Sequence, residues 1–214
     1  MNSEERFVMI KLYGSPLSSA GRCYWMLEEL GLPYEVVPLN MKEKEHKHDA
    51  YLKINPNGKV PALVDGEFTI WESMAINSYL AKKYESPLAP KTLEEDALIQ
   101  QWSYWGLVDL QEPAVSWMIQ EIFVPAEHRN AQVIENAKKS LPRVLDVLNQ
   151  GLENKTYLVG NRVTLAEVNL GTIMDIVLAL KFDLSPYGNI QKWLKEIHQR
   201  PAYQKVAALR KMPK

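Results

Sequence analysis

The periodicity of the apolar residues changes near residue 85, and this change limits the folds open to the chain. Up to Tyr84, short β-forming runs alternate with helical segments, whereas beyond Pro90 every periodic segment has the 3.6-residue period of an α-helix. The stretch from Ser86 to Pro90 has the composition of a linker. We therefore predict an α/β domain over residues 1–84, a linker over 85–93 and an all-helical domain over 94–214.

The first half of the α/β segment has the order of a β-α-β unit. Phe7–Tyr13 is rich in β-formers, Gly14-Ser15-Pro16 ends that run, and a helix is expected to begin near Ser18. Tyr34–Leu39 returns as a strand. The helix between the strands should bury one apolar stripe with i, i+3, i+4 and i+7 spacing, formed by Cys23, Met26, Leu27 and Leu30.

The second half of this segment has the order β-β-α. Two short β runs, Ala62–Val64 and Glu67–Ile70, flank Asp65-Gly66, a pair that favours a type I′ hairpin. Ser73 is expected to cap the helix that follows. A β-α-β unit, a connecting helix and a β-β-α unit together predict a thioredoxin-like domain.

The second half of the chain contains the signals of several helices. Two capping boxes, Thr92 with Glu95 and Thr164 with Glu167, are expected to open two of them. A third amphipathic segment contains Pro142, which should kink or disturb it. The remaining helical segments are Ile190–Ile197 and Tyr203–Leu209.

Composition excludes several classes of protein. Lys and Arg number 25 and Asp and Glu 26, so a net charge of -1 gives no electrostatic reason to bind nucleic acid or an anionic membrane. The single cysteine, Cys23, excludes an intramolecular disulfide and suits a reducing compartment. Residues 1–7 are polar, and no run approaches the roughly 20 apolar residues of a membrane span. We expect a cytoplasmic protein with no signal peptide.

Four local motifs occur in one order along the first 80 residues. They are Gly14-Ser15-Pro16-Leu17-Ser18 with Arg22 four residues later, Glu45-His46-Lys47, the run from Asn55 to Leu63, and Trp71-Glu72-Ser73-Met74-Ala75-Ile76. With these motifs the chain resembles the cytosolic glutathione transferases over nearly its whole length. The serine and its arginine spacing are most similar to the phi and theta types, in which a serine hydroxyl serves glutathione.

The resemblance implies that Ser18 is the catalytic residue. A free thiol has a pKa of about 8.5, and the thiolate is the reactive species. A hydroxyl donor near a helix N-terminus favours that anion, and lowering the pKa by about two units needs about 2.7 kcal/mol. From the residues alone, Ser18 is first of all a plain helix cap. Ser19 competes for both roles and, one residue further into the helix start, should be better placed to cap the helix. Cys23 lies on the apolar stripe and is expected to be a buried structural thiol.

The resemblance also implies a glutathione site in the first domain. Glu72 and Ser73 are expected to bind the γ-glutamyl end. A cis Val60-Pro61 bond is expected to turn the Val60 backbone toward the cysteinyl part. His46, Lys47 and Lys59 would lie near the glycyl carboxylate, although solvated surface charge is the alternative for these residues. No metal is expected, because His128 and His198 lack metal-ligand spacing.

The activity implied is addition of glutathione, as co-substrate, to apolar electrophiles that the helical domain binds. The same site suits a glutathione-dependent peroxidase, disulfide reductase or dehalogenase. A third alternative is a non-catalytic assembly module like the front domain of elongation factor 1 gamma. The family is dimeric, so a homodimer is expected. The long helix expected from Glu94 carries a cluster of large side chains, which is interpreted as core, dimer contact or pocket wall. The cluster comprises Trp102, Tyr104, Trp105, Trp117 and Met118.

Overall fold

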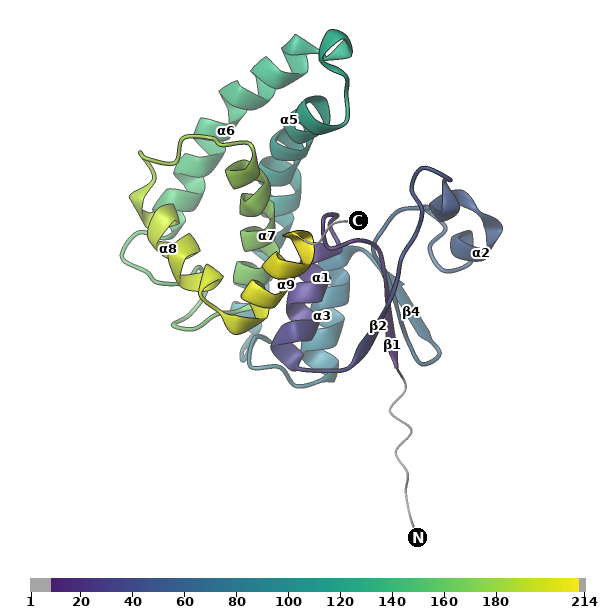
Figure 1. The fold of residues 1–214 in the computed structure, drawn as a ribbon. Helices are drawn as coiled ribbons and strands as arrows, with labels where there is room; N and C mark the ends of the chain where they lie inside the picture. Colours follow the sequence, from purple (N-terminus) through teal and green to yellow (C-terminus); the bar gives the residue numbers. More distant parts are fainter. Residues whose placement is uncertain (1–8, 212–214) are drawn as a thin grey trace. The chain divides into compact units, whose positions relative to one another are not determined.

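The computed structural model describes residues 9–211, which pack into two compact units. The first unit contains the chain up to Ser86 together with the residues from Pro201 onward, and the second contains Pro87–Arg200. The C-terminal helix therefore packs within the first unit, although sequence position groups it with the helical half. The expected functional division at residues 84 and 94 stays a prediction. Figure 1 labels the elements of both units.

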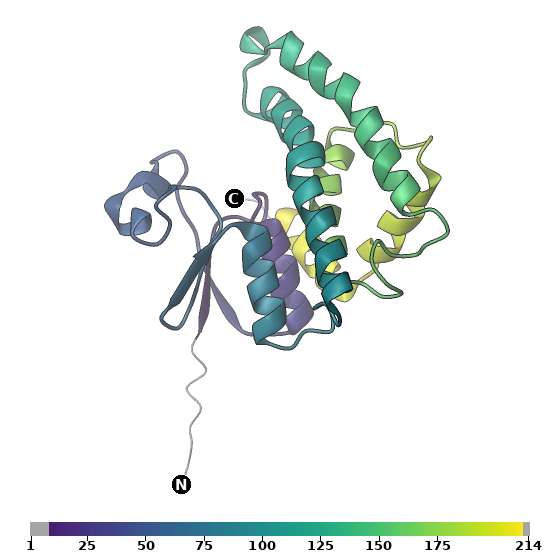
Figure 2. The same cartoon turned by 180° about the vertical axis from the view of Figure 1, so that it is seen from behind.

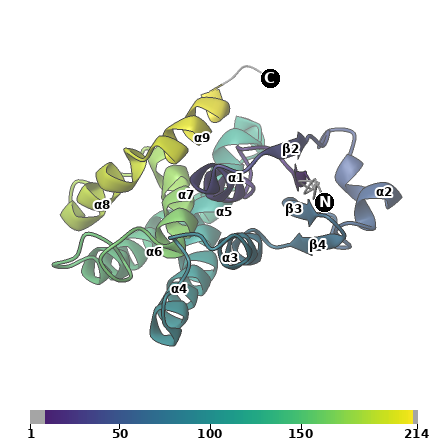
Figure 3. The same cartoon turned by 90° about the horizontal axis from the view of Figure 1, so that it is seen from below.

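The first unit is built on a mixed four-stranded sheet of order β2-β1-β3-β4. The strands are β1 (Ile10–Tyr13), β2 (Tyr34–Val37), β3 (Ala62–Asp65) and β4 (Phe68–Trp71). β1 is parallel to β2, and the other two pairings are antiparallel. Helices α1 (Gly21–Leu30) and α3 (Ser73–Lys83) cover one face of the sheet (Figure 3). The thioredoxin-like prediction is confirmed; residues 7 and 8 of its first strand lie outside the described residues.

The hairpin between β3 and β4 differs in detail from the expected type I′ turn. Asp65 pairs with Phe68, so the two loop residues are Gly66 and Glu67. Of these two, Gly66 has a positive φ, of 68°. Glycine at the first central position is the pattern of a type II′ turn. The prediction was wrong because Asp65 remains a strand residue, where its side chain accepts hydrogen bonds from Tyr79, Lys83 and Tyr84.

Helix α1 is buried on more faces than its apolar stripe predicts. Cys23, Met26 and Leu27 are buried as expected and Leu30 is half-buried, but Tyr24 and Trp25 are buried too. The reason is α9 (Pro201–Lys211), which packs along α1 and places Tyr203 against Trp25 with ring centroids 4.9 Å apart. The spacing of apolar residues along α1 does not reveal this second neighbour, because α9 lies far away in the sequence.

The second unit consists of helices and their connections (Figures 1 and 2). Its helices are α4 (Leu93–Trp105), the π-helical turn η2 (Gly106–Leu110), α5 (Gln111–Ile122), α6 (Ala131–Gly151), α7 (Leu165–Ala179) and α8 (Gly188–His198). The short helices of the chain are η1 (Glu45–Lys47) and α2 (Asp49–Leu52) in the first unit and η3 (Ala126–His128) in the second. Within residues 9–211, no helix has both the length and the apolar character needed to cross a membrane.

Two prolines of this unit lie inside α-helices, Pro113 in α5 and Pro142 in α6, with different local results. Pro113 has no N–H to donate and its ring would crowd the Asp109 carbonyl, and the π-helical turn that contains Asp109 accommodates both effects. Pro142 lies inside α6, and α6 still runs as one element from Ala131 to Gly151. The kink or local disturbance expected at Pro142 therefore does not interrupt the helix.

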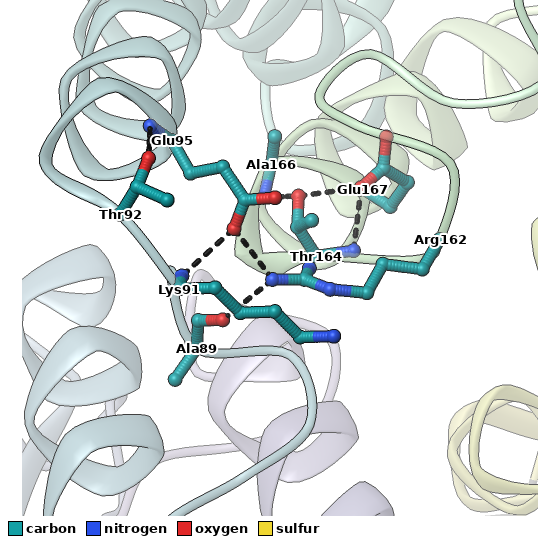
Figure 4. Close-up of polar contacts among 8 residues, drawn as sticks. All are labelled: Ala89, Lys91, Thr92, Glu95, Arg162, Thr164, Ala166 and Glu167. Carbon is teal, nitrogen blue, oxygen red and sulfur yellow. Dashed lines mark hydrogen bonds and ion pairs between the residues drawn. The ribbon is translucent and has the colours of Figure 1, made fainter.

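The two capping boxes are not equally complete (Figure 4). The Thr164 box is full, because Thr164 Oγ1 accepts from the backbone while Glu167 Oε2 accepts from the Thr164 N–H at 2.7 Å. In the Thr92 box, Thr92 Oγ1 accepts from the Glu95 N–H at 3.2 Å. The Glu95 carboxylate instead accepts from the Lys91 N–H at 2.8 Å and from Arg162 Nη2 at 2.6 Å. Both helix starts were predicted, but only the second has the reciprocal bond.

Candidate functional site

Three loops of the first unit emerge at the same end of the sheet. Tyr13 pairs with Ala62 in antiparallel register, so Gly14 and Pro61 follow on side by side. Ala62 in turn pairs with Trp71, which brings Pro61 beside Glu72. The loop after β1, the bond before β3 and the start of α3 therefore meet, and these segments contain the predicted serine, valine-proline and glutamate-serine motifs.

Gly14 makes the close approach of two of these loops possible. Its φ is 124°, a conformation that favours glycine, and Tyr24 donates to its carbonyl at 2.8 Å. A Cβ at this position would lie 3.1 Å from Val60 Cβ and 3.5 Å from Ser18 Oγ. Ser18 and Val60 thus border the same small space.

The two neighbouring serines make different hydrogen bonds. The Ser18 hydroxyl donates to the Ser15 carbonyl at 2.7 Å and accepts from the Ala20 N–H at 3.2 Å. Ser19 donates to the Val60 carbonyl at 3.1 Å. The expectation that Ser19 caps the helix was wrong: α1 has Ala20 at its N-cap position and no capping side chain. Ser19 instead ties the loop to the segment before β3, and Ser18 stays half-buried at the mouth of the turn.

The Val60-Pro61 peptide bond is cis, as expected. The backbone before it is held by two residues that sequence reasoning did not single out for a role. Asn55 Nδ2 donates to the Lys59 carbonyl at 2.6 Å, and Tyr51 donates from its hydroxyl to the same oxygen at 2.7 Å. The available signal was the Asn-Pro-Asn-Gly turn, because a buried asparagine in a turn usually serves backbone groups.

The predicted basic residues gather around that turn. A Cβ on Gly58 would lie 2.7 Å from the His46 carbonyl and 2.8 Å from Lys47 Nζ, so glycine permits η1 to pack here. Lys47 Nζ also donates to the Asn57 carbonyl at 3.2 Å. His46 is half-buried, and its Nδ1 accepts and donates no hydrogen bond among the described residues. Lys59 is exposed.

Glu72 and Ser73 form the start of α3 in an unusual backbone conformation. Glu72 is the N-cap residue with φ 72° and ψ 112°, its side chain makes no capping hydrogen bond, and the residue is exposed. Ser73 is buried and is the first helical residue, so it does not cap the helix as expected. A non-glycine residue at positive φ costs free energy, and such residues concentrate at functional sites.

Arg22 and Cys23 lie beneath these loops. Burial raises the pKa of Cys23 to about 12, so its thiol is protonated. The thiol donates a hydrogen bond to the Ser73 carbonyl, with Sγ 3.4 Å from the oxygen. Burial lowers the pKa of Arg22 to about 10, against the opposing effect of Cys23 and the Glu72 carboxylate. Arg22 is still a cation at neutral pH. The prediction of a buried structural cysteine is confirmed.

Comparison with known proteins identifies relatives along the chain. The family model for the glutathione S-transferase N-terminal domain matches residues 8–82, and that for the C-terminal domain matches residues 113–201. A probable glutathione S-transferase GSTF2 of Oryza sativa subsp. japonica is 35% identical over 212 residues, which is 95% of this chain and 98% of the relative.

Two solved structures show the same fold. The structure of glutathione S-transferase-I bound with lactoylglutathione has a TM-score of 0.86 at 33% identity, and the match covers 94% of this chain and 99% of that one. A theta class glutathione S-transferase from Xanthomonas axonopodis pv. citri, with glutathione bound, has a TM-score of 0.86 at 28% identity. This match covers 92% of this chain and 95% of the other.

Proposed function

Since the chain belongs to the glutathione S-transferase family and is a glutathione S-transferase, we propose that it binds glutathione where the three loops meet at the end of the sheet. The observation that supports this position is the strand register, which places Gly14, Pro61 and Glu72 side by side. A relative of the same fold was solved with glutathione bound.

Each part of glutathione has a chemically suitable partner at this sheet end. The exposed Glu72 carboxylate pairs with the γ-glutamyl ammonium, while Ser73 and the N-terminal N–H groups of α3 receive the carboxylate. The Val60 backbone pairs with the cysteinyl part as an added strand would. Its carbonyl already accepts from Ser19, so a ligand shares that oxygen or relies on the N–H. His46, Lys47 and Lys59 supply donors for the glycyl carboxylate.

We assign the catalytic role to Ser18. Its hydroxyl now donates to the Ser15 carbonyl, and a rotation about the side chain redirects that proton to a thiolate beside Val60. The hydrogen bond that the Ser18 hydroxyl accepts from the Ala20 N–H would remain, and it would make the hydroxyl a stronger donor. Ser19 is already committed to Val60, and Cys23 is buried with a raised pKa, so neither has Ser18's freedom to turn toward the ligand.

The thiolate then attacks an apolar electrophile, and proximity and anion stabilisation drive the addition or displacement. We place the electrophile site in the helical part, residues 94–214, with glutathione bound by residues 1–84 and a linker between. Conjugation is favoured over peroxide or disulfide reduction, dehalogenation or a purely structural role, because the relatives reported above are transferases. A homodimer is consistent with exposed apolar side chains at Leu93, Tyr104 and Val108.

Titration of the bound glutathione thiol tests this mechanism. Ser18→Ala should raise the pKa of the thiol by about one to two units and reduce turnover, while the affinity for glutathione changes little. Ser19→Ala and Cys23→Ala should keep the pKa and lose stability instead. An unchanged pKa in Ser18→Ala with a raised pKa in Ser19→Ala would transfer the role to Ser19. Loss of chemistry in Cys23→Ala alone would overturn the serine mechanism.

A further inference from the structure

The C-terminal helix α9 runs back along α1 and reaches the serine loop. Tyr203, near its start, packs on Trp25, and Lys205 Nζ lies 3.1 Å from a Glu28 carboxylate oxygen. Arg210, near its end, donates from Nε to the Pro16 carbonyl at 3.2 Å. The two helices are therefore antiparallel, and the last turn of α9 lies at the N-terminus of α1.

The guanidinium of Arg210 occupies a space that a glycine provides. A Cβ at Gly21 would lie 2.8 Å from Arg210 Nη2 and 2.7 Å from the Pro16 carbonyl oxygen. Gly21 also donates from its N–H to the Ser18 carbonyl at 2.9 Å. Arg210 thus touches the serine loop on both sides of Ser18, at Pro16 before it and at Gly21 after it.

We infer that Arg210 is a positioning residue for the thiolate site: its hydrogen bond to Pro16 holds the turn that presents Ser18, and its positive charge stabilises an anion formed there. This inference rests on the proposed role of Ser18. Arginine stays charged at any pH at which the enzyme works, and its planar fork of donors can bond a carbonyl in a fixed orientation. The charge adds to the partial positive charge of the α1 N-terminus.

A purely structural role is the alternative, in which Arg210 only docks α9 onto α1. The chain offers a matched control for this alternative. Lys205 joins the same two helices through Glu28, but at the far end of α1 from Ser18. Lys205→Ala therefore removes an α9–α1 contact without touching the serine loop.

The test is a titration of bound glutathione by ultraviolet absorption, with the pH profile of kcat, in the full-length Arg210→Ala, Arg210→Lys and Lys205→Ala proteins. In Arg210→Ala we expect the pKa of the thiol to rise by about half a unit and kcat to fall about three-fold on the acid side of the profile. The loss should vanish at alkaline pH, where the thiol is ionised in every protein. Arg210→Lys keeps the charge and should recover most of the effect.

The outcomes separate this inference from the proposed function. An unchanged pKa in Arg210→Ala, or an equal change in Lys205→Ala, would overturn the inference. A uniform loss of kcat at all pH values would do the same, because it would indicate a structural effect. Ser18→Ala is titrated in parallel: if it shifts the pKa and Arg210→Ala does not, only the inference about Arg210 fails. If Ser18→Ala also leaves the pKa unchanged, the proposed catalytic role itself fails.

Discussion

Two glutamates at two helix starts have opposite environments. Glu167, in the first turn of α7, is fully buried, and its carboxylate accepts from the Leu158 N–H, the Thr164 N–H and the Thr164 hydroxyl, each at 2.7 Å. Glu72, at the N-cap of α3, is exposed, makes no capping bond and has a φ of 72°. The helix dipole favours a carboxylate at both positions.

The contrast separates a carboxylate that stabilises the fold from one that remains available to a ligand. Burial raises the pKa of Glu167, and hydrogen bonds from its own neighbours oppose that rise, so the side chain is fully occupied within the helical unit. The backbone conformation of Glu72 costs free energy, and its side chain makes no capping hydrogen bond that would offset this cost. We expect mutation of Glu167 to affect stability and mutation of Glu72 to affect binding.

The largest expected effect is that of Glu167→Ala. The change leaves three buried donors without an acceptor, and each unsatisfied donor costs about 1–3 kcal/mol, so we expect a loss of about 3–5 kcal/mol in the free energy of unfolding. Urea denaturation measures this loss. Glu167→Gln keeps one acceptor oxygen and should lose about half as much. A loss below about 1 kcal/mol in the alanine variant would remove the distinction between the two glutamates.

Asp65 is a structural carboxylate in the same unit as Glu72. Its Oδ2 accepts from Lys83 Nζ at 2.7 Å, the Tyr84 hydroxyl at 2.9 Å and the Tyr79 hydroxyl at 3.0 Å. Burial alone would raise the pKa of Asp65, but these hydrogen bonds outweigh it and the pKa lies below its ordinary value. We expect Asp65→Asn to lose about 2 kcal/mol of stability at neutral pH.

The pH dependence of that loss tests its origin. Because the pKa of Asp65 is lowered in the folded state, its stabilisation is present above the unfolded value of about 3.9 and is lost as the pH falls through the folded value. In a denaturation series the stabilities of the wild type and Asp65→Asn should therefore approach each other as the pH falls below the unfolded value, and meet below the lowered folded pKa. If the difference in the free energy of unfolding stays constant from neutral to acid pH, the charge of Asp65 is not responsible for it.

The difference between the two glutamates was only partly predictable from the sequence. Thr164 with Glu167 is a local pattern whose spacing predicts a helix start. The spacing does not by itself predict the reciprocal bond, because Thr92 and Glu95 have the same spacing and lack it. The bond of Ser19 depends instead on which carbonyl a distant segment presents, because Val60 lies 41 residues from Ser19. The same reason explains why Arg210 was missed, because Pro16 lies 194 residues away. Asn55 serves the Lys59 carbonyl within its own turn, so a local signal for its role was present in the sequence.

Glu72→Gly should separate strain from function. Relief of the positive φ, less the added flexibility of glycine in the unfolded chain, should raise stability by about 1 kcal/mol. Calorimetry should at the same time show glutathione binding weakened at least about ten-fold, through loss of a charge-assisted hydrogen bond.

Glu85 provides a control for this substitution. It is an exposed glutamate in the same unit with φ 48°, so Glu85→Gly makes the same chemical change at another positive-φ position. Glutathione affinity should not change in Glu85→Gly. Equal loss of binding in both variants would show that Glu72 acts through the stability of the first unit and not through contact with glutathione.

The smallest expected effect is that of Thr92→Ala, in the incomplete box of α4. The threonine hydroxyl accepts one N–H, from Glu95, at an exposed helix start, and such caps contribute about 0.5–1 kcal/mol. The Glu95 carboxylate bonds to Lys91 and Arg162 instead of to Thr92, so those contacts survive the substitution.

Thr164→Ala removes an acceptor and a donor from a buried, reciprocal box, and should cost at least about twice as much stability as Thr92→Ala. Urea denaturation of both variants compares them directly. Equal losses would mean that the burial and the reciprocal bond of the Thr164 box add nothing to its contribution to stability.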